Sequence, residues 1–197
     1  VSVKGLAVRE VPANLAIWPI SYEGAGDSLP AVQEQLQTSY NHLRAFLLDK
    51  GFAVENISRS APRITDFATQ YGGDKPPYRY KADEVITVRS DKTALVKRAM
   101  SEVGALIGKG IVLVHNYEFQ PRFEFTQLND IKPEMIAQAT KNARKAARQF
   151  AEDSGSTVGG IKRASQGLFT IYDRDRYTPE IKRIRVVTTV DYFLVDD

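Results

Sequence analysis

The spacing of apolar and polar residues changes several times along the chain, and each spacing predicts a type of element. From Val1 to Tyr22, β-branched and apolar residues predict extended structure, interrupted by Pro12 and Pro19. Because a proline nitrogen cannot donate to a β-ladder, proline inside a strand indicates an edge or a bulge. The chain is therefore predicted to begin with edge-type β-structure.

Three later segments carry apolar residues at intervals of three and four, which predicts amphipathic helices. Ser28 provides an N-cap for the first helix, and Gly51 stands where a left-handed residue would end it. Pro133 falls in the first turn of the third helix, where proline is tolerated. The predicted helices cover residues 29–50, 91–107 and 130–153.

Strands are predicted around these helices, at residues 54–66, 78–89, 111–125, 167–172 and 184–195. Alternation of Phe119, Phe123 and Phe125 with polar residues is typical of a sheet with one buried face. The order β-α-β-β-α-β-α-β-β predicts an α+β fold, with helices on one face of a largely antiparallel sheet. We expect a single domain over residues 1–197, or two lobes with residues 128–197 as the second.

The composition is that of an ordinary globular protein, with 43% hydrophobic and 26% charged residues among 197. No apolar run, Ile111 to Val114 included, approaches the roughly 20 residues that span a bilayer. The lack of cysteine excludes disulfides, thiol catalysis and cysteine-ligated zinc. Because the chain starts at Val1 in a strand-like run, we expect a signal or anchor segment to have preceded it.

The net charge of +3 is unevenly distributed. Residues 132–185 hold 12 Lys or Arg and 6 Asp or Glu, a surplus of six positive charges. A basic stripe on the third predicted helix consists of Lys141, Arg144, Lys145 and Arg148. It could contact an anionic surface or be a solvated face, and Glu134 and Glu152 favour the solvated face because they dilute its charge.

The opposite face of the third helix is predicted to be its packing face, because small and apolar residues recur there at helical spacing. Alanine side chains would let the helix approach the sheet closely. The predicted packing face consists of Ile136, Ala139, Ala143, Ala146, Ala147 and Phe150.

The stretch SGSTVGGIKRAS, residues 154–165, resembles a phosphate-binding loop in its glycines and its lysine. A P-loop runs from strand to helix, whereas this stretch leaves a helix, and Ile161 stands where the lysine is needed. We therefore interpret Gly155 as a helix stop and Gly159–Gly160 as a turn. The GAGDSL stretch at residues 24–29 lacks the third glycine of a dinucleotide fingerprint and is also interpreted as a turn.

No metal, cofactor or catalytic residue is predicted. His42 and His115 have no partner at metal-ligand spacing, and no nucleophile elbow occurs. Asp173 and Asp175 resemble the start of a calcium loop but lack its glycine and its glutamate. The aromatic residues could stack on single-stranded nucleic acid, but the usual RNA-recognition signature is missing, so no specific nucleic-acid partner is expected.

Small residues and turn residues across nearly the whole chain resemble the SIMPL-domain family. Asn14 departs from the family, which has an acid near this position. The matching residues are Gly5, Ala7, Val11, Pro12, Tyr80, Ala82, Asn142, Ala143, Ala146, Gly155, Gly159 and Ile161.

The resemblance implies a non-enzymatic protein of the bacterial periplasm or cell envelope. It implies action through self-assembly or partner binding, a link to oxidative-stress tolerance, and no established catalytic residues. Pro19 and Pro121 indicate interrupted edge strands, so a homo-oligomer that pairs through sheet edges is expected. A membrane surface or other envelope proteins are expected as further partners. Two alternatives stay open. One is a hydrolase whose active site no sequence motif reveals, and the other is a protein that binds anionic surfaces or nucleic acid through the third helix.

Overall fold

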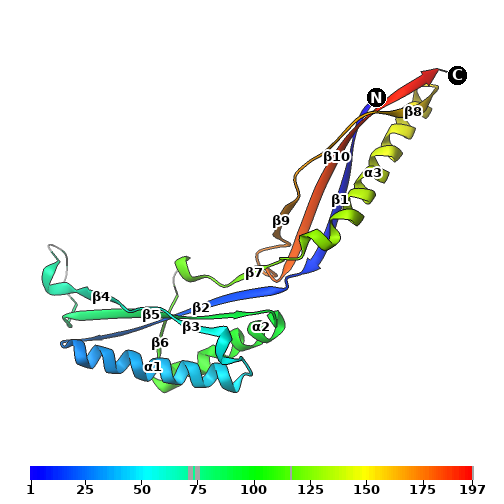
Figure 1. Cartoon of the computed structure of the whole chain (residues 1–197). Helices are drawn as coiled ribbons and strands as arrows, with labels where there is room; N and C mark the ends of the chain where they lie inside the picture. Colours follow the sequence, from blue (N-terminus) through cyan, green and yellow to red (C-terminus); the bar gives the residue numbers. More distant parts are fainter. Residues whose placement is uncertain (71–72, 74–75, 116, 197) are drawn as a thin grey trace. The chain divides into compact units, whose positions relative to one another are not determined.

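The chain forms two compact units, each built from an antiparallel sheet and one or more α-helices. The computed structural model describes residues 1–70, 73, 76–115 and 117–196 (Figure 1). Unit 1 combines residues 1–14 with residues 124–197, and unit 2 consists of residues 15–123. The predicted α+β class with antiparallel pairing is confirmed, and the strands divide between two sheets.

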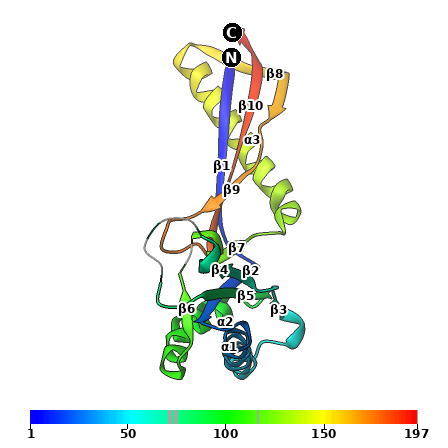
Figure 2. The same ribbon diagram turned by 90° about the vertical axis from the view of Figure 1, so that its left-hand side faces the viewer.

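Unit 1 contains a sheet with the strand order β1-β10-β8, in which β9 also pairs with β10. Figures 1 and 2 show α3 running along β1 and β10. Because β1 lies at the end of the strand order, Pro12 stands in an edge strand, as predicted. The elements are β1 (Ser2–Pro12), α3 (Leu128–Asp153), β8 (Ser156–Gln166), β9 (Thr170–Asp173) and β10 (Ile181–Asp196).

Backbones of β1 and α3 approach closely enough that only small residues fit between them. A Cβ atom at Gly5 would lie 1.8 Å from the Ala139 carbonyl oxygen and 2.4 Å from the Ala143 nitrogen. The Asn142 amide also donates a 2.7 Å hydrogen bond to the Leu6 carbonyl. The alanine face therefore exists because helix and strand are nearly in backbone contact.

The packing face of α3 is rotated slightly from the predicted one. Ala139, Ala143 and Ala147 are fully buried, as predicted, whereas Phe150 is 58% exposed and that prediction is wrong. Phe150 lies outside the row of buried residues, whose next member after Ala147 is Ala151. The buried residues follow a strict four-residue interval and are Met135, Ala139, Ala143, Ala147 and Ala151.

Unit 2 contains a sheet with the order β3-β5-β2-β6, in which β4 pairs with β5 and β7 with β2. The strands are β2 (Leu15–Gly26), β3 (Ile57–Arg59), β4 (Arg63–Asp66), β5 (Tyr80–Ser90), β6 (Val112–Val114) and β7 (Arg122–Glu124). The α-helices are α1 (Leu29–Asp49) and α2 (Thr93–Glu102). The described residues also form short 3₁₀ helices, which are η1 (Val54–Asn56), η2 (Phe67–Thr69), η3 (Val103–Lys109) and η4 (Tyr117–Phe119).

Local signals placed α1 correctly. The Ser28 hydroxyl accepts from the Ala31 N–H, so Ser28 is the predicted N-cap. Gly51 follows the helix with a φ of 93°, a left-handed conformation that favours glycine. The buried face of α1 consists of Val32, Leu36, Ser39, Leu43 and Leu47.

Several strand predictions need correction. The extended stretch Val1–Tyr22 is two strands that belong to different units, and residues 54–66 contain η1 and two short strands. In the described part of the predicted run 111–125, the strands are limited to β6 and to Arg122–Glu124, and Phe119 lies in η4. Part of the predicted turn at residues 69–77 lies outside the described residues.

The predicted Gly159–Gly160 turn is also wrong, because both glycines lie inside β8. Gly155 follows α3 with a φ of 68°, a left-handed conformation that is typical of a glycine that ends a helix. Its interpretation as a helix stop is therefore confirmed. The sequence of β8 consists largely of polar residues and glycines and shows no alternation of apolar and polar positions, so this strand was not predicted. Its extended conformation comes from pairing with β10 along its length.

Candidate functional site

The basic stripe of α3 is the largest group of predicted site residues that the fold leaves accessible. Its four members, Lys141, Arg144, Lys145 and Arg148, are all exposed. None of them forms an ion pair with any other residue in the described part of the chain. The N-terminal half of the same helix differs, because Glu134 pairs with Arg9 at 2.6 Å. The stripe therefore presents uncompensated positive charge.

Two of the four cations line a hollow in the surface of unit 1, and the other two do not. Arg144 and Arg148 line a hollow of about 260 Å³ together with residues of β8 and β10. Lys141 and Lys145 stand on the stripe outside this hollow. The fold therefore places the two arginines beside β8 and β10, which the sequence alone did not show.

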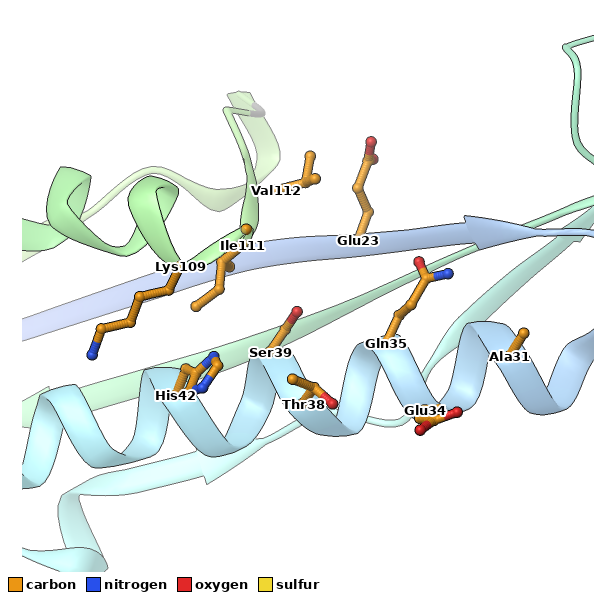
Figure 3. Close-up of a pocket in the computed structure, with 11 residues that line it drawn as sticks. Glu23, Ala31, Glu34, Gln35, Thr38, Ser39, His42, Lys109, Ile111 and Val112 are labelled. Atoms are coloured by element: carbon orange, nitrogen blue, oxygen red, sulfur yellow. The ribbon is translucent and has the colours of Figure 1, made fainter.

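Unit 2 contains a larger groove between α1 and the segment that joins η3 to β6 (Figure 3). The groove measures about 490 Å³, and its polar lining residues include Glu23, Glu34, Ser39, His42 and Lys109. Figure 3 shows His42 and Ser39 on successive turns of α1. These groups of both charge signs could hold a small polar molecule.

His42 is the one histidine among the described residues that line the groove. Its Nδ1 atom is buried and has no hydrogen-bond partner among the described residues. Ser39 lies three residues earlier on the same helix, but no hydrogen bond joins the two side chains in the part of the chain that the structure describes. A serine nucleophile needs that bond to its base, so the hydrolase alternative stays a prediction.

A buried charged cluster in unit 2 was missed by the sequence analysis. The Tyr22 hydroxyl donates a 2.5 Å hydrogen bond to Glu84, which lies opposite it on β5. Arg59 donates to both carboxylate oxygens of Glu84, at 2.8 and 3.0 Å, and its guanidinium lies 4.2 Å from the Tyr40 ring centre. Glu84 lies in the same two-residue register as Ala82, Ile86 and Val88, and this was the signal that its side chain points inward.

This cluster holds the sheet of unit 2 together. Glu84 is 2% exposed and Tyr22 is fully buried. Burial raises the pKa of Tyr22, and the hydrogen bond to Glu84 raises it further, so the tyrosine stays protonated. A buried carboxylate needs such partners. The hydrogen bonds from Tyr22 and Arg59 therefore account for the buried Glu84 without any ligand.

The other residues that the sequence analysis weighed as metal ligands are His115, Asp173 and Asp175, and each has a neighbouring side chain or backbone group. His115 is exposed, and its ring centre lies 6.5 Å from that of Tyr117. Asp173 pairs with Lys182, and Asp175 accepts hydrogen bonds from the Tyr177 and Thr178 backbone. Among the described residues, no group of three or more His, Asp or Glu side chains could hold a metal ion.

Comparison with known families agrees with the packing motifs. The SIMPL family model, described as a protein of unknown function (DUF541), matches residues 1–187. The chain belongs to the SIMPL family. No curated protein matches the sequence. None of the helices in the described part of this SIMPL protein is long and apolar enough to cross a membrane.

The residues that carry the SIMPL resemblance act in packing in this chain. Gly5 and Ala143 form the close approach of β1 and α3, and Asn142 fixes it by bonding the Leu6 carbonyl. Gly155 ends α3, and Ala82 is buried in β5. SIMPL membership therefore identifies the architecture, and the exposed cations of α3 are not among the residues that carry the resemblance.

Proposed function

We propose that this SIMPL protein is a non-enzymatic component of the bacterial cell envelope that contacts an anionic surface through the basic stripe of α3. The observation that carries the proposal is the stripe itself, with four exposed cations on one helix face and no ion pair to them in the described residues. Uncompensated charge of one sign attracts an oppositely charged surface. The envelope location and a role in stress tolerance are supported by the family resemblance.

The stripe alone supports only weak binding. Four cations close to an anionic lipid surface give a dissociation constant of about 1 mM. Several copies of the stripe on one assembly would raise the effective affinity without any new contact. Self-assembly is therefore part of the proposal.

Features of unit 1 support assembly with a second copy. β1 is an edge strand, and α3 covers only one face of the sheet. Leu6 and Val8 are 44% and 48% exposed and lie beside Val187 and Arg185 of β10. Open edges and exposed apolar residues of a sheet favour pairing with another chain. Light scattering that finds only a 22.0 kDa species at high concentration would remove this part of the proposal.

Vesicle binding tests the surface contact directly. We expect the protein to sediment with phosphatidylglycerol vesicles at low salt but not with neutral phosphatidylcholine vesicles. Binding should disappear in 1 M salt, where the Debye length falls to about 3 Å. Changing all four stripe residues to glutamine should abolish it.

A matched control removes the same charge elsewhere. Arg89, Lys92, Arg98 and Lys109 of unit 2 are also exposed, and their glutamine variant loses four positive charges without touching α3. We expect this control to bind vesicles like the parent. Equal loss in both variants would mean that net charge, and not the stripe, governs binding. If the parent does not bind, the stripe is a solvated face.

A further inference from the structure

We propose that Arg144, Arg148 and the Tyr192 hydroxyl form a binding site for a phosphate-class anion, in the hollow between α3 and β8. This inference deepens the proposed surface contact and rests on it for its biological setting. The site lies wholly within unit 1. The residues lining the hollow are Arg144, Arg148, Val158, Gly159, Gly160, Ile161 and Tyr192.

The Tyr192 hydroxyl is the first observation that indicates a ligand. Tyr192 lies on β10, is 3% exposed, and packs among Val3, Ala143 and Ala147. Its hydroxyl oxygen is buried and has no hydrogen-bond partner among the described residues. A buried hydroxyl without a partner is costly, because it has lost its water and gained nothing in return. An anion in the adjoining hollow would supply the missing acceptor.

The charge of the lining favours an anion. Two arginines contribute to it, and no carboxylate belongs to the described residues that line the hollow. Guanidinium groups bind phosphate oxygens through paired N–H donors. Arg148 lies five residues before the end of α3 at Asp153, which is more than one helical turn, so the negative end of the helix dipole has little effect there.

The glycine pair of β8 provides the third observation. Between the pairs Val158–Leu194 and Ile161–Tyr192, β8 has two residues where β10 has only Phe193. This extra residue is a β-bulge, a feature often found beside binding sites at sheet edges. Gly159 and Gly160 are the two residues of the bulge, so the ladder is locally open where the hollow lies.

The two glycines differ in what surrounds them. A Cβ atom at Gly159 would lie 3.2 Å from Phe193, so packing accounts for this glycine. At Gly160 a Cβ atom would meet nothing within 4 Å, and its φ is not positive. Neither a clash nor the backbone conformation accounts for glycine at position 160. Its missing side chain leaves the hollow beside the arginines open.

The size of the hollow limits the ligand. Pockets for drug-sized molecules measure about 300–1,000 Å³, and this hollow of about 260 Å³ falls below that range. It suits a single phosphate group but not a nucleotide. The phosphate could be free in solution or part of a lipid headgroup, and both present the same oxygens.

Titration with inorganic phosphate tests the site. We would follow amide signals of the 15N-labelled full chain by NMR at constant ionic strength, with chloride as the reference anion. We expect saturable shifts of Gly159 and Gly160. Arg144→Gln combined with Arg148→Gln should weaken phosphate binding at least about tenfold, because hydrogen bonds to charged groups are the strong ones.

Two further variants keep the test specific. Lys141→Gln combined with Lys145→Gln removes the same charge outside the hollow and should leave phosphate affinity within about twofold. Tyr192→Phe removes only the hydroxyl that has no partner, so the protein should be at least as stable as the parent while phosphate binding weakens about tenfold. Parent-like phosphate affinity of Tyr192→Phe, or equal weakening by both double variants, would overturn the proposal.

The results separate this site from the broader surface contact. If the stripe alone matters, both double variants lose vesicle binding equally and phosphate causes no local shifts, which overturns the anion site but not the surface contact. Site-specific phosphate shifts without any vesicle binding support the anion site, identify free phosphate as its source, and overturn the surface contact. Phosphate that displaces the protein from phosphatidic acid vesicles supports a lipid phosphate.

Discussion

Replacing Gly5 by alanine should destabilise unit 1 strongly, because the new methyl group would collide with the backbone of α3. The added Cβ would lie 1.8 Å from the Ala139 carbonyl oxygen, whereas real Cβ contacts are essentially never under 3.0 Å. The helix and the strand must therefore separate by roughly 1.2 Å. No side-chain rotation can relieve the clash, since the atoms it meets belong to the backbone.

Two costs determine how far the free energy of unfolding should fall in Gly5→Ala. Overpacking of this kind costs about 1–3 kcal/mol. The hydrogen bond from Asn142 to Leu6 is 2.7 Å long, and a separation of that size would break it at a further cost of about 0.5–1.5 kcal/mol. We therefore expect the free energy of unfolding to fall by about 1.5–4.5 kcal/mol.

Urea denaturation followed by far-UV circular dichroism measures this change. Gly160→Ala is the matched control, because it adds the same methyl group to the same unit where nothing lies within 4 Å. We expect the control to change stability by less than about 1 kcal/mol, and in the stabilising direction. The reasoning is refuted if Gly5→Ala unfolds at the parent's midpoint, or if Gly160→Ala is equally destabilised.

Two other predictions concern unit 1. Ala143→Leu should lower the free energy of unfolding by about 1–3 kcal/mol, since Ala143 is fully buried against β1; a urea midpoint equal to the parent's would contradict this packing. The Thr178 hydroxyl and the Tyr177 N–H, by donating to Asp175, lower the pKa of its carboxyl to about 2. Its contribution to stability is therefore complete above the ordinary pKa of 3.8 and is lost as the pH falls through about 2. NMR titration of the carboxyl measures this pKa, and a midpoint near 3.8 would show that the loop contacts do not form in solution.

The helices and the α+β class could be predicted from the sequence. A helix bonds each N–H to a carbonyl four residues earlier, so its spacing, its cap at Ser28 and its stop at Gly51 are all local signals. The same geometry placed the basic stripe on one face of α3. The buried alanines followed from helical spacing too, although Phe150 was assigned to the wrong face.

Strand partners could not be predicted in the same way, because they lie far away in the sequence. Val1 bonds to Tyr192, so β1 and β10 bring together opposite ends of the chain. β8 lacks any apolar alternation, and pairing with β10 alone makes it a strand. The division of Val1–Tyr22 between two units depends on such distant partners.

The candidate anion site depends on the tertiary structure even more. Its arginines, its glycines and Tyr192 come from three elements that have no common motif, and the bulge in β8 exists only relative to β10. The sequence determined that α3 presents a row of cations. Only the packing of α3 and β8 around Tyr192 decided which two of those cations border a hollow, because that choice depends on contacts between residues far apart in the sequence, such as Ala143 and Tyr192.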